Sequence, residues 1–355
     1  MVNNFASLDD IARFNTTAFF DQLFVVCNKK NEHQSTSSFN YSGFDISTEF
    51  LSDSEFDEVI TLLGLLHTPI EIFQNETDFL DYVIHNTKSL KKVLVYNSAQ
   101  SGIGPGRKSL VPAFCNMKRI PYTGSNAYVV SLCRHKYHVN KLLSFAGHQV
   151  PLSWLYDENG WLEGPPEINK KVIVKPIYES ASIGIDDHAV FFYTAKSDEE
   201  IFKKHKELKQ PILVQEFITG YEVEYPFLCF RGYPIPLLPI GISLDNENQA
   251  MGNNILTYEK VYFDKYRFYD FSSNTQTDTR IARDAAHAVR ILGLNGLCRV
   301  DFRVSENGEP YITDVSANPH FVTHSSVHFA IKQMGFDVDF IPRSIVASAN
   351  FLGLV

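Results

Sequence analysis

The stretch LCRVDFRVSENGEPYITDVSANP (297–319) constrains the fold most strongly, because it predicts a β-hairpin with acids at defined positions. Its Asn307-Gly308 dipeptide lies between two runs of alternating apolar and polar residues. This dipeptide favours a two-residue turn, since both central positions of such a turn need a positive φ. The turn places Asp301 opposite Asp314, with both side chains on one face of the hairpin.

Two carboxylates that face each other destabilise a sheet unless a cation lies between them. With no Cys or His beside them, these oxygen ligands suit Mg²⁺ or Mn²⁺ better than zinc. The same register places Arg299 opposite Ser316 on the acid face, where Arg299 supplies a fixed positive charge. Two alternatives stay open. The acids of a surface hairpin are simply solvated, and a three-residue loop would shift the register by one and separate the pair.

Lys175 is the second informative residue, because it lies in the otherwise apolar run KVIVKP (171–176), which Pro176 ends. Burying an ammonium group is costly unless an anion meets it. The loop YESASIG (178–184) follows, and such small-residue loops bind phosphate oxygens through backbone N–H groups. The alternative is a lysine whose stem is buried and whose ammonium reaches water.

A nucleotide-binding edge is suggested by LVQEFITGYEVE (213–224), an apolar run followed by Gly220 and Glu222. Main-chain groups of such a strand are suited to an adenine, and a carboxylate at Glu222 is suited to a ribose. This pattern alone is weak.

Strands and helices alternate along the chain, which predicts an α/β or α+β protein. We expect strands at 19–27, 91–98, 171–176, 188–195 and 211–217, and helices at 197–210 and 278–293. Ser197 and Glu200 have the spacing of a capping box, and Gly293 is expected to end its helix. Composition shifts near 121–126 and 218–226 divide the chain into about three parts.

The composition excludes several classes of protein. The 355 residues carry 32 basic and 41 acidic side chains, for a net charge of −9, so a nucleic-acid partner is not supported. Five dispersed cysteines indicate free thiols in a reducing compartment. No signal peptide and no apolar run of membrane-spanning length is visible. We therefore expect a cytoplasmic protein without a membrane partner.

Two motifs resemble functional sites and fail on spacing. In SGIGPGRKS (101–109), Arg107 separates Gly106 from Lys108, so the contiguous Gly-Lys-Ser of a Walker phosphate loop is absent. The histidines at 320, 324 and 328 have helical spacing, but Pro319 and neighbouring β-branched residues oppose one helix over all three. Neither a phosphate loop nor a zinc site is expected here.

The order of these segments carries a family resemblance. Lys136 in RHKYHVNKLL, then VIVKP, QEFITGYE, RVD and DVSANP resembles the ATP-grasp superfamily, and most closely its D-alanine–D-alanine ligase branch. PYTGSN (121–126) and THSS (323–326) resemble further segments of that branch, and the resemblance covers about residues 119–332.

The resemblance implies an ATP-grasp fold of three α/β domains, with ATP between the central and C-terminal ones. We expect an N-terminal domain at 1–125, a central subdomain at 126–222 and a C-terminal subdomain at 223–355. ATP and Mg²⁺ are the implied cofactors, with two ions expected and Mn²⁺ as a substitute. The substrates would be a small carboxylate and an amine, and we retain a homodimer as a hypothesis.

The resemblance also implies a set of site residues. Catalytic roles fall to Arg299, Lys260 (or Lys265) and Ser182; nucleotide contacts to Lys136, Lys175, Gln215, Glu216, Ile218 and Glu222; metal ligands to Asp301, Asp314 and Ser316; and acceptor contacts to Ser325 and Ser326.

Several positions depart from the pattern of the branch. Ser316 stands where an Asn ligand is usual, Asp314 replaces a longer Glu, and Ala181 replaces a loop Ser that orients substrate. The segment NSAQSGIGPG (97–106) lacks a His-Gly pair, and we expect Gln100, Arg107 and Lys108, which lie in or just after it, to be available to a larger or more anionic donor.

We therefore expect an ATP-dependent carboxylate–amine ligase that works through an acyl phosphate on a donor other than D-alanine. The alternatives are D-alanine–D-alanine ligase itself and a degenerate ATP-grasp protein that binds nucleotide and regulates. Asn318 is an alternative metal ligand to Ser316.

Overall fold

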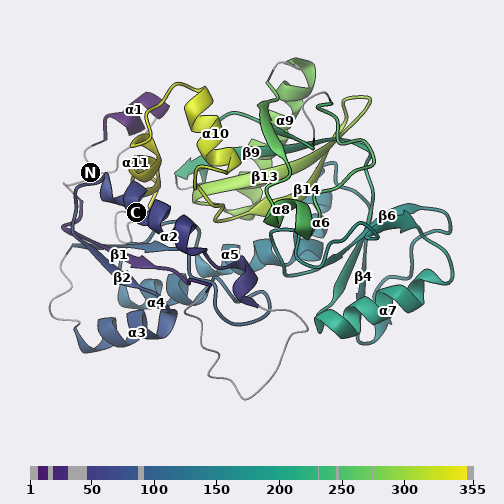
Figure 1. The fold of residues 1–355 in the computed structure, drawn as a ribbon, viewed down its shortest axis with the longest axis horizontal. Helices are drawn as coiled ribbons and strands as arrows, with labels where there is room; N and C mark the ends of the chain where they lie inside the picture. The colour runs from purple at the N-terminus through teal and green to yellow at the C-terminus, as the bar shows by residue number, and fades with distance from the viewer. Residues whose placement is uncertain are drawn as a thin grey trace.

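A computed structural model of the chain describes residues 7–14, 19–30, 46–86, 92–230, 232–244, 248–272 and 275–349. The strands form three separate sheets, which follow one another along the chain (Figure 1).

The first sheet is parallel, with strand order β2-β1-β3. Its central strand is buried along nearly its whole length, as expected for a parallel sheet that helices cover. The elements of this part are α1 (Leu8–Ala12), β1 (Gln22–Val26), the 3-10 helix η2 (Ile46–Glu49), α2 (Asp53–Gly64), β2 (Ile70–Phe73), α3 (Glu76–His85), β3 (Val93–Asn97) and α4 (Leu110–Lys118).

The second sheet is antiparallel, with order β5-β4-β8-β6-β7, and α7 packs against it through Ile201 and Leu208. Its elements are β4 (Ser153–Asp157), β5 (Gly160–Trp161), β6 (Lys171–Pro176), β7 (Val190–Phe192), α7 (Ser197–Leu208) and β8 (Ile212–Glu216).

The third sheet has the order β12-β11-β9-β13-β14, with β10 paired to β9. Helices α5, α6 and α9 share one apolar core with it. The elements are α5 (Ala127–Arg134), α6 (Lys136–Phe145), β9 (Gly220–Phe230), β10 (Tyr233–Pro236), β11 (Ile240–Ser243), α8 (Tyr258–Tyr262), β12 (Arg267–Asp270), α9 (Thr275–Leu292), β13 (Gly296–Ser305), β14 (Pro310–Ser316), α10 (Ser326–Gln333) and α11 (Phe340–Ala347).

Packing joins segments that lie far apart in sequence. Helix α11 contacts α1 and α2, and one apolar core contains residues of both the first and the last parts of the chain (Figure 1). Residues 127–145, which we expected in the central subdomain, pack on the third sheet, and β9 begins before the proposed boundary at residue 222. The three-part division remains our proposal for the domain boundaries.

The expected strands and helices are present with shifted ends. The strand expected at 91–98 covers Val93–Asn97, and Lys91 lies outside the described residues. Helix α9 ends before Gly293, whose φ is +71°. The expected capping box of α7 is wrong: Lys196 is the N-cap, and the Ser197 hydroxyl instead accepts a hydrogen bond from the backbone N–H of Thr194 at 3.0 Å.

The hairpin has the expected acid pair, but the expected two-residue turn is wrong. The turn contains Glu306, Asn307 and Gly308, because the N–H of Ser305 donates to the carbonyl of Glu309 and that of Gly308 to the carbonyl of Ser305. Of the two residues of the Asn-Gly dipeptide, only Gly308 has a positive φ, at +80°.

A β-bulge on β14 then restores the original register. The pairing shifts between Asp301 and Phe302, which leaves Thr313 as the extra residue. Its hydroxyl donates to the carbonyl of Asp301 at 3.2 Å. Beyond the bulge, Asp301 pairs with Asp314 and Arg299 with Ser316, as expected.

Candidate active site

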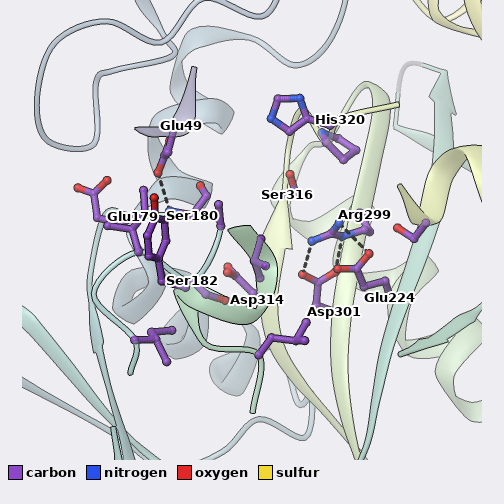
Figure 2. Close-up of a pocket in the computed structure, with 18 of the residues that line it drawn as sticks. Glu49, Glu179, Ser180, Ser182, Glu224, Arg299, Asp301, Asp314, Ser316 and His320 are labelled. Carbon is purple, nitrogen blue, oxygen red and sulfur yellow. Dashed lines mark hydrogen bonds and ion pairs between the residues drawn. The ribbon is translucent and has the colours of Figure 1, made fainter. Parts of the chain in front are cut away.

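A cleft of about 800 Å³ is lined by residues of all three parts of the chain (Figure 2). It brings together twelve of the expected site residues besides Arg299: Lys136, Lys175, Ser182, Gln215, Glu216, Ile218, Glu222, Asp301, Asp314, Ser316, Ser325 and Ser326. Lys260 is not among the lining residues.

Acidic side chains cross three adjacent strands at the centre of the cleft. Glu224 on β9 pairs with Asp301 on β13, which pairs in turn with Asp314 on β14. Arg299 donates to both oxygens of Asp301, at 2.7 and 2.8 Å, and lies 2.8 Å from the carboxylate of Glu224 (Figure 2). Burial, with the charge of Glu224 added, raises the pKa of Asp301 to about 7 despite Arg299.

Lys136 binds the other acid of the hairpin. Its Nζ donates to Asp314 Oδ2 at 2.8 Å. Burial alone would raise the pKa of Asp314, but the ammonium groups of Lys136 and Lys175 hold it below the usual value. Lys175 Nζ donates to Gln215 Oε1 at 3.2 Å, and burial lowers its pKa. Asp314 therefore has two ammonium groups near it, and the same two groups are suited to an anionic ligand bound beside this carboxylate.

These oxygen donors fit a hard divalent cation. Asp301 and Asp314 are opposed carboxylates, and each is now neutralised by a protein cation that a bound metal would replace. Ser316 lines the cleft beside them. Asn318 uses its amide nitrogen to bind the carbonyl of Asn97 at 2.9 Å. Within the described residues, no three His, Cys, Asp or Glu side chains gather as a ready-made metal site.

The expected nucleotide residues lie at the end of the cleft formed by β8 and β9. Arg303, which the sequence analysis missed, donates to the carbonyl of Ile218 and to the carboxylate of Glu222, each at 2.9 Å. Glu216 forms an ion pair with Lys170 at 3.5 Å. Arg303 thus holds Ile218 and Glu222, two of the six residues that the resemblance assigns to the nucleotide.

The loop after β6 is held in a strained conformation. Ala181 and Ser182 have φ values of +51° and +55°, a conformation that costs a residue with a side chain about 1–2 kcal/mol. The N–H of Ser180 donates to Glu49 at 2.6 Å (Figure 2). The loop is therefore tied to the N-terminal part of the chain.

Glu49 belongs to a buried network of two glutamates and two arginines that the sequence analysis missed. Arg134 lies 2.8 Å from Glu49, and Arg107 lies 2.9 Å from Glu179. Although burial opposes it, Arg134 and Arg107 hold the pKa of Glu49 far below its usual value. Arg107, which we expected to be available to a substrate, is thus committed to the network.

The side chain of Lys260 does not line the cleft, where a role beside the phosphates would place it. Its Nζ donates to Asp187 at 3.0 Å and to the carbonyl of Ile255 at 3.3 Å, whereas its neighbours Val261 and Tyr262 line the cleft. Lys265, the second choice, pairs with Glu259 at 3.0 Å. A phosphate-side role for either lysine stays a prediction.

Ser325 and Ser326 lie at the start of α10. The Ser325 hydroxyl caps the helix by accepting from the N–H of His328 at 3.2 Å. Ser326 is 1% exposed, and its hydroxyl has no hydrogen-bond partner among the described residues. An unsatisfied hydroxyl in the wall of a cleft is suited to a ligand.

The site residues that the sequence analysis did not identify differ in how readily a local sequence pattern predicts them. Glu224 follows Glu222 by two residues in a strand, so the alternation of side chains places both on one face. Glu49 and Arg134 meet across the N-terminal and central parts of the chain, and no local pattern predicts that contact.

Solved structures show what the fold is. D-alanine–D-alanine ligase from Bacillus anthracis complexed with ATP matches with a TM-score of 0.64 at 16% identity, over 92% of this chain and 96% of that one. VanG D-Ala:D-Ser ligase from Enterococcus faecalis matches with a TM-score of 0.64 at 17% identity, over 92% and 98%. The chain has the ATP-grasp fold.

The sequence comparisons identify the family to which the chain belongs. The family model described as D-ala D-ala ligase C-terminus matches residues 166–347, and the chain belongs to this family. D-alanine–D-alanine ligases of Aromatoleum aromaticum and Nitrosomonas eutropha are 25% and 26% identical. The first match spans 69% of this chain and 75% of the relative, and the second 66% and 72%.

The expected enzyme class is therefore confirmed: this is an ATP-dependent, ADP-forming ligase that makes C–N bonds. Its substrates are small molecules, and ligases of this family use ATP and a divalent metal. No helix in the part of the chain that the structure describes has the length and apolar character needed to cross a bilayer.

Proposed function

We propose that the enzyme joins a donor carboxylate other than D-alanine to an amine. The donor carboxylate attacks the γ-phosphate of ATP and releases ADP; the amine then attacks the carbonyl carbon of the acyl phosphate and expels phosphate. The observation that carries this proposal is the donor end of the cleft, where Ala181 offers no hydroxyl and Lys108 faces the cavity.

The residues of the cleft are suited to the separate steps. Lys136 and Lys175 would bind phosphate oxygens, and Arg299, held by Asp301 and Glu224, would stabilise the oxyanion that develops when the amine attacks. Asp301 and Asp314 would hold the metal, with Ser316 or Asn318 as a further ligand. A divalent metal at this place neutralises phosphate charge.

Ala181 bears on donor choice because a methyl side chain is a poor basis for recognition. A pocket distinguishes one methyl group by only about 1–3 kcal/mol, so D-alanine must be read through its ammonium and carboxylate groups. With alanine at this position, one side chain that would bind the ammonium or carboxylate group of D-alanine is missing. The N-terminal part of the chain supplies Lys108 to this end of the cleft instead, and a cation there suits a different donor.

The test is ATP-dependent phosphate release with pooled amino acids and carboxylates, followed by identification of the products by mass. We expect D-alanine alone to give a rate near the ATP-only background, and at least one other donor to exceed it. Robust D-alanyl-D-alanine production at millimolar D-alanine would contradict the proposal and favour D-alanine–D-alanine ligase, which the relatives support equally well.

One observation favours a second candidate, a nucleotide-binding protein without turnover. Lys136 and Arg299 neutralise Asp314 and Asp301 within the protein, so the carboxylates are satisfied without a metal. ATP binding without phosphate release from any donor in the pool would support this candidate.

A further inference from the structure

Lys108 lines the cleft and takes no part in the reaction steps described above. It follows the glycine-rich segment 101–106 and precedes α4. It lines the cleft, yet its ammonium group forms no ion pair or hydrogen bond with any residue that the structure describes. A cation in such a place is costly unless something compensates it.

The acids nearest to Lys108 are already committed. Glu49 and Glu179 belong to the buried network, where Arg134 and Arg107 balance their two charges. Lys136, another cation within electrostatic reach of Lys108, is bound to Asp314. Within the described residues, neither of these acids forms an ion pair with Lys108.

The acids across the cleft accept hydrogen bonds from neutral groups and form no ion pair with Lys108. Glu55 accepts from both the N–H and the hydroxyl of Ser52, each at 2.7 Å, in the capping box of α2. Glu58 accepts from the N–H and the hydroxyl of Thr323. His320, which also lines the cleft, has its pKa lowered to about 4 by burial and by Lys108, so it is neutral near pH 7. It supplies no counter-charge.

Burial and the neighbouring cation Arg134 also lower the pKa of Lys108, to about 7. An anion bound beside it would restore the charged form. A negative group on a ligand would therefore compensate Lys108, with which no side chain of the described residues forms an ion pair.

From this we infer that the donor is a carboxylic acid with a second anionic group, which Lys108 binds while the reacting carboxylate lies near Lys136 and Arg299. This inference rests on the proposed function. Since the resemblance assigns Ser325 and Ser326 to the acceptor, the end formed by Lys108 and Gln100 is left for the donor. Since Lys108 and Lys136 line the same cleft, we take the two anionic groups to belong to one small molecule.

The experiment compares pairs of acids that differ only in a carboxylate or a carboxamide: succinate and succinamate, aspartate and asparagine, glutamate and glutamine, the amino acids in both chiral forms. Phosphate release is measured with ATP and pooled amines. Binding of each acid is measured by calorimetry with Mg²⁺ and a non-hydrolysable ATP analogue.

We expect the wild type to prefer the dianionic member of at least one pair by about 10- to 100-fold, the value of one charge-assisted hydrogen bond. Lys108→Met should abolish this preference, and Lys108→Arg should keep most of it. Lys203→Met on α7 is the control, since the side chain of Lys203 is 78% exposed and does not line the cleft.

Three outcomes would overturn the inference: a wild-type preference for the carboxamides, an equal preference in Lys108→Met and wild type, or a Lys108→Met variant in which only the KM for ATP rises. The last would make Lys108 a phosphate ligand. If Lys108→Met does not fold, the wild-type preference and Lys108→Arg decide.

The two proposals fail separately. Dianions that bind preferentially without phosphate release would leave the inference standing and contradict the ligase proposal. Phosphate release with only those donors that lack a second anionic group would do the reverse.

Discussion

Replacing Lys108 by Met should stabilise the unliganded protein, and more strongly at acid than at alkaline pH. Burial, with Arg134 nearby, lowers the pKa of Lys108 from its ordinary 10.5 to about 7. The folded protein therefore resists taking up a proton that the unfolded chain accepts readily. Methionine fills a similar volume and carries no charge.

The size of the effect follows from the difference between the two pKa values. Above pH 10.5 both states are neutral and the full stability is present; as the pH falls to about 7, the unfolded state alone gains the proton and stability is lost. The loss is about 1.4 kcal/mol per pH unit. Between about pH 9 and about pH 6 it reaches about 2.5 kcal/mol, which water in the cleft reduces toward about 1 kcal/mol.

The assay is urea unfolding of both proteins across this pH range, followed by circular dichroism. The free energy of unfolding of Lys108→Met should exceed that of the wild type by a margin that grows as the pH falls. Lys203→Met should show no such margin, because that side chain is exposed. A difference that does not change with pH, or a less stable Met variant at about pH 6, would refute the reasoning.

Three further predictions concern the rest of the cleft. Asp301→Asn and Asp314→Asn should each lower ATP turnover by about a hundredfold or more while leaving the circular dichroism spectrum unchanged, and near-normal turnover in both would contradict the metal hypothesis. Ser316→Asn should lower the Mg²⁺ concentration for half-maximal turnover, because an amide oxygen is a longer and better ligand than a hydroxyl; an unchanged metal dependence would favour Asn318. Glu49→Gln should lower the free energy of unfolding by about 3–5 kcal/mol in urea titrations, since it leaves the two buried guanidinium groups of Arg134 and Arg107 with Glu179 as their one carboxylate; a loss below about 1 kcal/mol would contradict this account.

The hairpin shows why a correct pairing can be predicted from an incorrect turn. The Asn-Gly dipeptide indicated a two-residue turn, whereas the structure has three turn residues and one bulge residue, Thr313. Each shifts the register by one, and the shifts cancel at Asp301 and Asp314. The alternation of apolar and polar residues on both strands demands this outcome, since a net slip of one would turn the apolar faces toward water.

Other local patterns were similarly informative. The apolar run that contains Lys175 predicted β6 with its observed bounds, and Gly293 ends α9 as its tolerance of a positive φ suggested. The order of the motifs indicated the family, because each motif depends on a few residues that are neighbours in sequence. The side-chain direction of Lys260 was not predictable in this way, since it depends on Asp187, far away in the chain.

What the sequence by itself determined is the set of strands, the acid hairpin and the class of chemistry, because strand patterning, turn residues and short motifs act over a few neighbouring residues. Only the tertiary structure decided which charges compensate each other. Glu49 meets Arg134 and Ser180, Glu224 meets Arg299, and Lys108 is left without a partner among the described residues. Burial makes each of these pairings energetically decisive, and burial depends on the packing of all three parts of the chain around one cleft.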